Sequence, residues 1–251
     1  MSNFNLYAQY YDLLYKDKDY SGEAAYIHKL IQHHYPNAKS ILNLGCGTGK
    51  HDFELAKYGY TIHGIDLSNE MIEIANANNT QKDTLIFTQG DVRNFETNAK
   101  FDVVVSLFHV MSYQTTNQDL QKTYETATKH LSENGLFIFD CWYGPGVLTD
   151  PPITRVKHIE NEKITVLRIA ESDLYPQKNV VNVNYEVRVK DKATNAEEIV
   201  KETHSMRYLF DTDVEYLNSN NNLKNLATHK WLGFEAPQLN TWNTIFVCQK
   251  K

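Results

Sequence analysis

The chain has 251 residues, a formal net charge of −6 and 41% hydrophobic residues, enough apolar material for one elaborated α/β domain or two small ones. Because no run of lysine or arginine exceeds two residues, the sequence argues against duplex DNA or RNA as a partner. The polar, tyrosine-rich start and the lack of an apolar run near ~18 residues predict neither a signal peptide nor a membrane span.

The stretch up to residue 145 alternates between short apolar runs and helical patterns. Gly59 is placed to end one helix, and Ser68 is placed to cap the start of the next. Short buried strands separated by helices predict a parallel sheet wound on both faces. The expected strands are 40–45, 60–66, 84–91, 101–108 and 134–142, and the expected helices are 23–35, 52–59, 68–79 and 119–131.

The pattern changes after residues 143–146, which read Tyr-Gly-Pro-Gly. The next three stretches are rich in Val, Ile, Thr and Tyr, and one of them alternates strictly, so we expect three antiparallel strands. A helix and a last strand should follow. The three strand stretches are 156–173, 179–191 and 197–210, the helix is 211–220, and the last strand is 242–250.

These elements predict a Rossmann-like, doubly wound α/β fold with an antiparallel β insertion before its final strand. We divide the chain into four parts. Residues 1–35 form an N-terminal helical lid, 36–145 the ligand-binding core, 146–210 the insertion and substrate region, and 211–251 a helix and strand that complete the sheet.

Three alternate glycines, Gly45, Gly47 and Gly49, lie between the first expected strand and the next helix. This is where a doubly wound sheet presents its ligand crevice, and glycine lets a ligand approach the backbone. The spacing is G-x-G-x-G, so the third glycine comes one position too early for a dinucleotide fingerprint. An NAD-dependent oxidoreductase is therefore disfavoured, and a tight turn without a ligand remains an alternative.

Two carboxylates follow strand ends in the same half. Asp66 can accept two ribose hydroxyls, and Asp91 followed by Val92 suits an adenine amino group beside an apolar face. The structural alternatives are that Asp66 competes with Ser68 as a helix cap and that Asp91 is a turn residue after Gly90.

The order of these features resembles the class I S-adenosylmethionine-dependent methyltransferases across ~140 residues. The residues that carry the resemblance are LNLGCGTGKH, GIDLSNEMI, GDV at 90–92, FDVVVSLFHVMSY and LSENGLFIFD. One departure is Asn43, where the family usually has an acid. The resemblance implies S-adenosylmethionine as cofactor, held by Tyr11, Gly45, Gly47, Gly49, Asp66, Leu67, Met71, Asp91, Val92 and Leu107.

A second resemblance is to the N-methyltransferases that dimethylate an amino group on nucleotide-linked sugars. It rests on residues 10–20, 106–113 and 139–145 and on the β-rich insertion. It implies that Tyr113 lies near the amine and Tyr11 near the methionine end of the cofactor. That branch has a Gly-Arg-Gly stretch before its last strand, whereas this chain has Asn-Thr-Trp-Asn-Thr at 240–244, which leaves the substrate phosphate without that arginine.

Two residues after the fourth strand are candidates for the chemistry. His109 has a suitable intrinsic pKa to remove the amine proton, and Tyr113 can orient the amine by a hydrogen bond or ring contact. Their alternatives are a buried loop histidine and simple packing. Most of the rate can come from positioning the amine in line with the transferred methyl group.

Other aromatic and cationic residues are candidates for substrate binding. Trp142 and Tyr143 follow the fifth strand and can stack on a sugar or base, or plug the junction with the insertion. Arg168 and Arg207 lie on insertion strands and can face an acidic substrate, or be solvated. Tyrosines four apart near the N-terminus suggest an aromatic lid over the cofactor or a packing stripe; they are Tyr7, Tyr11 and Tyr15.

The sequence therefore predicts a methyltransferase that acts on a small molecule, with N-methylation of an amino sugar as the leading hypothesis. O- or C-methylation of another metabolite and a non-catalytic S-adenosylmethionine-binding module are the alternatives. Three scattered cysteines without metal spacing predict no metal site and a reducing, cytoplasmic location. We expect a monomer or a homodimer.

Overall fold

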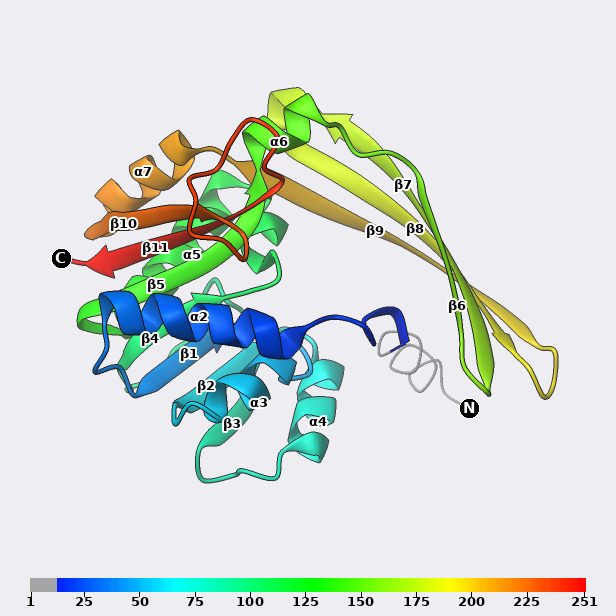
Figure 1. The fold of residues 1–251 in the computed structure, drawn as a ribbon, viewed down its shortest axis with the longest axis horizontal. Coiled ribbons are helices and arrows are strands. Elements are labelled where there is room, and N and C mark those ends of the chain that lie inside the picture. Colours follow the sequence, from blue (N-terminus) through cyan, green and yellow to red (C-terminus); the bar gives the residue numbers. More distant parts are fainter. Residues whose placement is uncertain (1–12) are drawn as a thin grey trace.

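The computed structural model describes residues 13–251, and its first half is a parallel sheet covered by helices on both faces (Figure 1). The sheet order in this half is β3-β2-β1-β4-β5. The strands are β1 (Ser40–Leu44), β2 (Thr61–Asp66), β3 (Leu85–Gln89), β4 (Phe101–Ser106) and β5 (Leu131–Tyr143). The helices are α2 (Tyr20–His34), α3 (Lys50–Ala56), α4 (Asn69–Asn78), α5 (Asn117–His130) and the 3-10 helix η1 (Val110–Tyr113).

Side chains alternate between the two faces of this sheet. Ile41 and Val103 pack with α2, α3 and α4, whereas Leu42 and Val104 pack with α5 and a later helix, α7 (Asp211–Asn220). Strands that bury both faces read as continuous apolar runs, which is why the sequence indicated them. The Ser68 side chain accepts a hydrogen bond from the Met71 N–H, so the predicted N-cap of α4 is confirmed.

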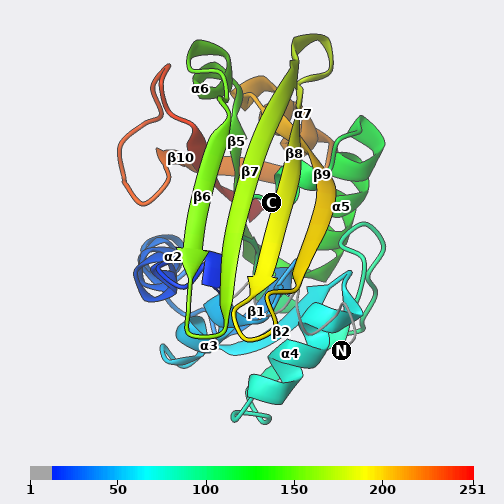
Figure 2. The same cartoon turned by 90° about the vertical axis from the view of Figure 1, so that its right-hand side faces the viewer.

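The insertion is a long antiparallel sheet that arches away from the core (Figure 1), and Figure 2 shows its strands face-on. It has four strands, not the predicted three, because the stretch 156–173 folds back as a hairpin at Asn161. The Asn161 side chain accepts hydrogen bonds from the N–H groups of Lys163 and Ile164 and so fixes this turn. The strands are β6 (Arg155–Glu160), β7 (Ile164–Tyr175), β8 (Val180–Asp191) and β9 (Glu197–Leu209).

The two sheets join at the end of β5. Strand β4 pairs with β5 as far as Ser106↔Phe139, and β9 then pairs with β5 at Trp142↔Tyr208. On its other side β5 pairs antiparallel with β11 (Asn243–Lys250), which pairs in turn with β10 (Leu223–Lys230). The sequence did not predict β10, α6 (Gly144–Thr149) or the 3-10 helix η2 (Pro176–Lys178).

Within residues 13–251, no helix is both long and apolar enough to cross a membrane.

Candidate functional site

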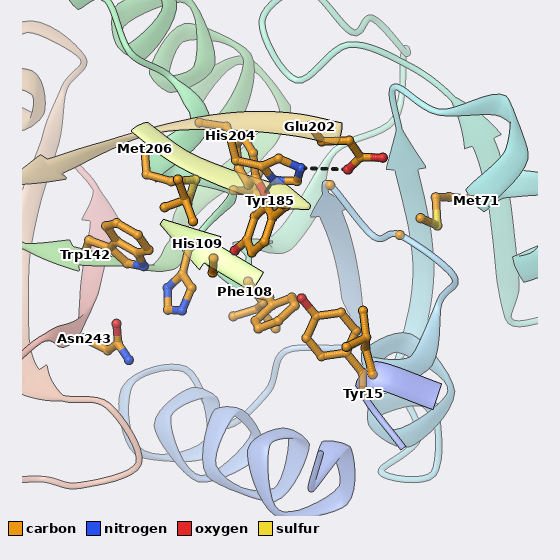
Figure 3. A pocket seen from close by; sticks show the side chains of 18 of the residues that line it. Tyr15, Met71, Phe108, His109, Trp142, Tyr185, Glu202, His204, Met206 and Asn243 are labelled. Carbon is orange, nitrogen blue, oxygen red and sulfur yellow. Dashed lines mark hydrogen bonds and ion pairs between the residues drawn. The ribbon is translucent and has the colours of Figure 1, made fainter. Parts of the chain in front are cut away.

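A cavity of about 560 Å³ lies between the carboxyl ends of the core strands and one face of the insertion sheet (Figure 3). Its volume is in the range of cofactor and substrate sites. The insertion contributes every second residue along β7, β8 and β9, because alternate side chains of a strand share a face. Of the residues singled out in the sequence, the cavity is lined by Tyr15, Gly45, Gly47, Asp66, Met71, Leu107, His109, Tyr113, Trp142 and Arg168.

The glycine loop presents bare backbone to this cavity at Gly47. Its φ is +55°, and a Cβ built there would meet no atom within 4 Å. The space beside its α-carbon is therefore open for a ligand to approach the backbone. Gly45 has φ +86°, and a Cβ there would lie 2.5 Å from the Val110 side chain. Gly49 does not line the cavity; its missing side chain makes room for the Phe87 ring.

Asp66 lines the cavity beside Gly47 and holds the loop. One carboxylate oxygen accepts the Gly47 N–H at 2.8 Å, and the other accepts the Ser68 N–H at 2.9 Å. Burial raises the pKa of Asp66, although the backbone hydrogen bonds from Ser68, Gly47 and Leu67 oppose that shift. Each oxygen has a further lone pair for a ribose hydroxyl, so the residues fit a nucleoside ligand.

Besides Gly49, three of the predicted cofactor residues lie outside the cavity lining: Leu67, Asp91 and Val92. Leu67 is 64% exposed, and Val92 is buried in the core on the α5 side. Arg93 binds Asp91, with Nη2 2.7 Å from Oδ2, and this hydrogen bond lowers the pKa of Asp91. The adenine role of Asp91 and Val92 stays a prediction.

A buried polar pair, Asn43 and Asp52, flanks the glycine loop. The Asn43 Nδ2 donates to Asp52 Oδ1 at 2.8 Å, and both side chains are almost fully buried. Burial raises the pKa of Asp52 to about 7, against the lowering effect of the Asn43 hydrogen bond. The sequence drew attention to Asn43 but not to its partner on α3.

His109 lies in a strained turn after β4. It and Phe108 both have φ +64°, a region that residues other than glycine seldom adopt. The His109 N–H donates to both oxygens of the buried Asp140 carboxylate at 3.1–3.2 Å, and its Nδ1 lies 2.7 Å from Oδ2. Asp140 on β5 thus fixes the imidazole at the cavity wall. Asp140 was not among the site residues predicted from the sequence.

Tyr113 contacts two insertion residues, His204 and Glu202, that were also not predicted from the sequence. Its hydroxyl lies 2.7 Å from His204 Nδ1. His204 Nε2 lies 3.2 Å from Glu202 Oε2, as Figure 3 shows by a dashed line. All three side chains line the cavity. Their alternate spacing on β9 was the available signal, because 202, 204 and 206 must share a face.

The predicted substrate residues divide into two groups. Trp142 lines the cavity and packs edge-on against Trp242, with ring centroids 5.3 Å apart, and the Arg168 guanidinium lies 5.2 Å over the Tyr185 ring. Tyr143 and Arg207 do not line it. The Tyr143 hydroxyl donates to Asp211, and Arg207 is bound to Asn117 at 2.7 Å and to Asp213 at 3.5 Å.

The segment before α2 crosses the cavity between the core and the insertion. The Tyr15 ring packs edge-on against Phe108 at 5.4 Å, and Lys157 on β6 donates to the Leu14 carbonyl at 2.8 Å. Tyr7 and Tyr11 lie outside the described residues, so their predicted roles stay predictions. In the described part of the chain, no group of three His, Cys, Asp or Glu side chains is placed to hold a metal ion.

Comparison with protein families matches residues 41–135 to a family model described as a methyltransferase domain. A relative from Streptomyces fradiae, dTDP-3-amino-3,6-dideoxy-alpha-D-glucopyranose N,N-dimethyltransferase, is 30% identical over 74% of this chain and 72% of its own. A relative from Streptomyces venezuelae, dTDP-3-amino-3,4,6-trideoxy-alpha-D-glucopyranose N,N-dimethyltransferase, is 31% identical over 66% and 69%.

Solved structures share the whole architecture. An S-adenosylmethionine-dependent methyltransferase from Clostridium acetobutylicum superposes with a TM-score of 0.83 at 21% identity and covers 98% of both chains. Streptomyces venezuelae DesVI superposes with a TM-score of 0.81 at 24% identity, again over 98% of both. These neighbours confirm the predicted Rossmann-like fold.

Proposed function

The chain belongs to the class I S-adenosylmethionine-dependent methyltransferases, and we propose that its methyl acceptor is the amino group of a nucleotide-linked amino sugar. It is an enzyme, and its methyl donor is S-adenosylmethionine. This cofactor, when bound, supplies an activated methyl group on a sulfonium. The contribution left to the protein is to bind, align and desolvate the acceptor and to remove its proton.

The cofactor half of the proposal rests on the loop and the acid beside it. Gly47 offers open backbone, and Asp66 offers lone pairs for the ribose hydroxyls. Met71, Leu107 and the Tyr15 ring supply apolar surface in the same cavity. We propose these residues as the cofactor site.

The acceptor half rests on one observation. The same cavity that contains the glycine loop is closed on its far side by the insertion face, with Tyr113, Tyr185 and His204 at its wall. A small polar acceptor placed there would have aromatic faces and hydrogen-bond partners around it. The two Streptomyces relatives act on amino groups of dTDP-linked sugars, which favours the same class here.

The nucleotide handle needs positive charge, and the arginine expected before the last strand is missing. Arg155 and Arg168, on adjacent strands β6 and β7, both line the cavity. We propose that these two arginines bind the diphosphate of the substrate, because a guanidinium group can donate two parallel hydrogen bonds to phosphate oxygens.

The test of this function is methyl transfer from labelled S-adenosylmethionine to a panel of amino sugars. The panel pairs each dTDP-amino sugar with its free amino sugar and with the dTDP-sugar that has a hydroxyl in place of the amine. We expect turnover only with the amine, and a lower KM for the dTDP-linked form. Transfer to the hydroxyl compound alone would overturn the proposal.

O-methylation is the second candidate, because Asp140 orients His109 as a committed base would be oriented. The variant His109→Ala distinguishes N-methylation from O-methylation. For an amine acceptor, which has other routes for its proton, we expect turnover to fall by roughly 10-fold or less. Loss of turnover by ~10³-fold or more would favour a hydroxyl acceptor.

We also propose a cytoplasmic enzyme, monomeric or homodimeric. Its three cysteines are buried and unpaired, which suits a reducing compartment.

A further inference from the structure

A chain of three polar side chains runs from the acceptor side of the cavity into the insertion. It consists of Tyr113 on η1 and His204 and Glu202 on β9. Tyr113 is separated from His204 by 91 residues in sequence, so the contact exists only because the insertion folds back over the core. The contact between His204 and Glu202 is local, because residues two apart on a strand share a face.

The insertion sheet holds His204 in one orientation. Thr203 and Ser205, its neighbours on β9, point to the opposite face and bind Asn184 and Asn182 on β8. His204 therefore faces the cavity, where the Tyr185 ring packs edge-on against it at 5.0 Å. The imidazole is fixed by β8 and β9 on one side and by η1 on the other.

The distances select one tautomer. Tyr113 has a hydroxyl proton to donate, so Nδ1 at 2.7 Å is the acceptor. A carboxylate has no proton to donate, so His204 Nε2, 3.2 Å from Glu202 Oε2, is protonated and donates. In this state the imidazole can take a second proton at Nδ1, and the carboxylate stabilises the resulting cation.

We propose that Tyr113, His204 and Glu202 form a relay that removes the proton from the acceptor amine. This inference rests on the proposed function, because an alkylammonium has no lone pair until it loses a proton. An N–H bond of the ammonium breaks as its proton forms a bond to Tyr113 Oη, and the phenol proton moves to His204 Nδ1. The products are a neutral amine and an imidazolium hydrogen-bonded to Glu202, so atoms and charge balance.

A second methyl transfer would need the relay again. The methylated amine forms as an ammonium and must lose a proton before it can attack another methyl group. Tyr113 touches the acceptor and is the catalytic residue in this scheme. His204 and Glu202 act through it. The charged and titratable groups that face His204 in the described chain are Tyr113, Tyr185 and Glu202, with Arg168 behind the Tyr185 ring.

The first experiment reads the imidazole directly, without turnover. Long-range ¹H–¹⁵N spectra of the protein with bound S-adenosylhomocysteine, assigned with His204→Asn, report its tautomer and pKa. We expect Nε2–H at pH 8, and a lower pKa of His204 in Glu202→Gln than in the wild type. Glu197→Gln, an exposed position on the same strand, is the control and should leave that pKa unchanged. An Nδ1–H tautomer, or an unchanged pKa in Glu202→Gln, would overturn the relay.

The second experiment measures kcat against pH with an accepted amine. In the wild type kcat should fall at low pH as His204 takes up a proton. In His204→Asn we expect kcat to fall ~10–100-fold and the acidic limb to disappear, with KM and the S-adenosylhomocysteine Kd within about threefold. His158→Asn, an exposed histidine of the same insertion, should behave as the wild type.

A double-variant cycle closes the test. Because Tyr113 and His204 act as one unit, Tyr113→Phe/His204→Asn should be no slower than the worse single variant. Multiplied losses, or an acidic limb that survives in His204→Asn, would reject the relay. If the wild type methylates a hydroxyl compound and no amine, the proposed function fails, while the tautomer and the Glu202→Gln shift still decide whether the relay geometry exists.

Discussion

Asp66 and Gly47 form the smallest unit of the proposed cofactor site. The Gly47 N–H donates to the Asp66 carboxylate, while its α-carbon turns an open side to the cavity. Removing either feature should weaken cofactor binding for different reasons. A carboxylate supplies strong acceptors, and a glycine supplies space and a left-handed φ.

Gly47→Ala has a matched control in Gly59→Ala. Both glycines have positive φ and open space where a Cβ would be, but only Gly47 lines the cavity. The backbone strain should cost each variant about 1 kcal/mol of unfolding free energy. We expect calorimetry to show S-adenosylhomocysteine affinity at least ~10-fold weaker in Gly47→Ala and unchanged in Gly59→Ala, since 1.4 kcal/mol of lost contact is tenfold. Equal affinities would remove Gly47 from the site.

Asp66→Asn should weaken S-adenosylhomocysteine binding by roughly 10–100-fold, because hydrogen bonds to a charged group are worth ~1.5–3 kcal/mol. Since burial raises the pKa of Asp66, wild-type affinity should fall on acidification earlier than an ordinary aspartate would require. The exposed Asp83→Asn is the control. A pH-independent Kd that survives Asp66→Asn would contradict this role.

At the scale of elements, helix α3 carries a buried acid. Asp52 has a folded-state pKa of about 7, above the ordinary value of 3.8. The folded chain therefore keeps a proton that the unfolded chain loses, so this group's stabilisation is complete below about pH 4 and is lost as pH rises through 7.

Asp52→Asn should keep the hydrogen bond from Asn43 and abolish this pH dependence. We expect the variant to be more stable than the wild type at pH 8, by on the order of 2–4 kcal/mol, and closer to it at pH 5. Urea unfolding at the two pH values measures the difference. If the difference in unfolding free energy between variant and wild type were the same at pH 5 and pH 8, Asp52 would be ionised in the folded protein at both pH values.

Arg207 ties three elements together. It lies at the end of β9 and binds Asn117 at the start of α5 and Asp213 on α7. Removing one partner of a buried ion pair costs about 3–5 kcal/mol. We expect Arg207→Ala to lose stability of this size by urea unfolding while its KM for the acceptor stays near the wild-type value. A selective rise in KM without unfolding would restore the substrate role expected from the sequence.

The elements differ in how far the sequence could anticipate them. Buried strands such as β1 and β4 are continuous apolar runs, so their pattern identifies them without tertiary information. Strand β10 is mostly half-exposed and polar, and only its pairing with β11 makes it a strand. The hairpin at Asn161 was hidden because both of its strands have similar composition.

For the whole molecule, cofactor binding should stabilise the fold. At 100 times Kd, S-adenosylhomocysteine adds about 2.7 kcal/mol, which should raise Tm by roughly 5–10 °C for a chain of this size. NADH is the control ligand and should give no shift. A rise in Tm with NADH and none with S-adenosylhomocysteine would contradict the assignment of the chain to this family.

In the candidate site too, residues that are close in sequence were easier to predict than residues that only the fold brings together. The glycine loop, Asp66 and His109 were found because a strand end and a loop place them together locally. Asp140 and His204 were missed because each meets its partner across a distance in sequence that only the folded register sets. Arg207 lies outside the cavity lining, since strand alternation turns it away from the face that holds His204 and Met206, and its substrate role stays a prediction.

The pairing of Trp142 with both β9 and β11 has a consequence for how such an enzyme changes over evolutionary time. Strand β5 pairs with β4 in the core and then with β9, so one continuous strand sets the distance between the donor half and the acceptor half. A lineage can exchange side chains on the cavity-lining face of β7, β8 and β9 and so change which sugar it accepts. The alignment of donor with acceptor is then inherited unchanged.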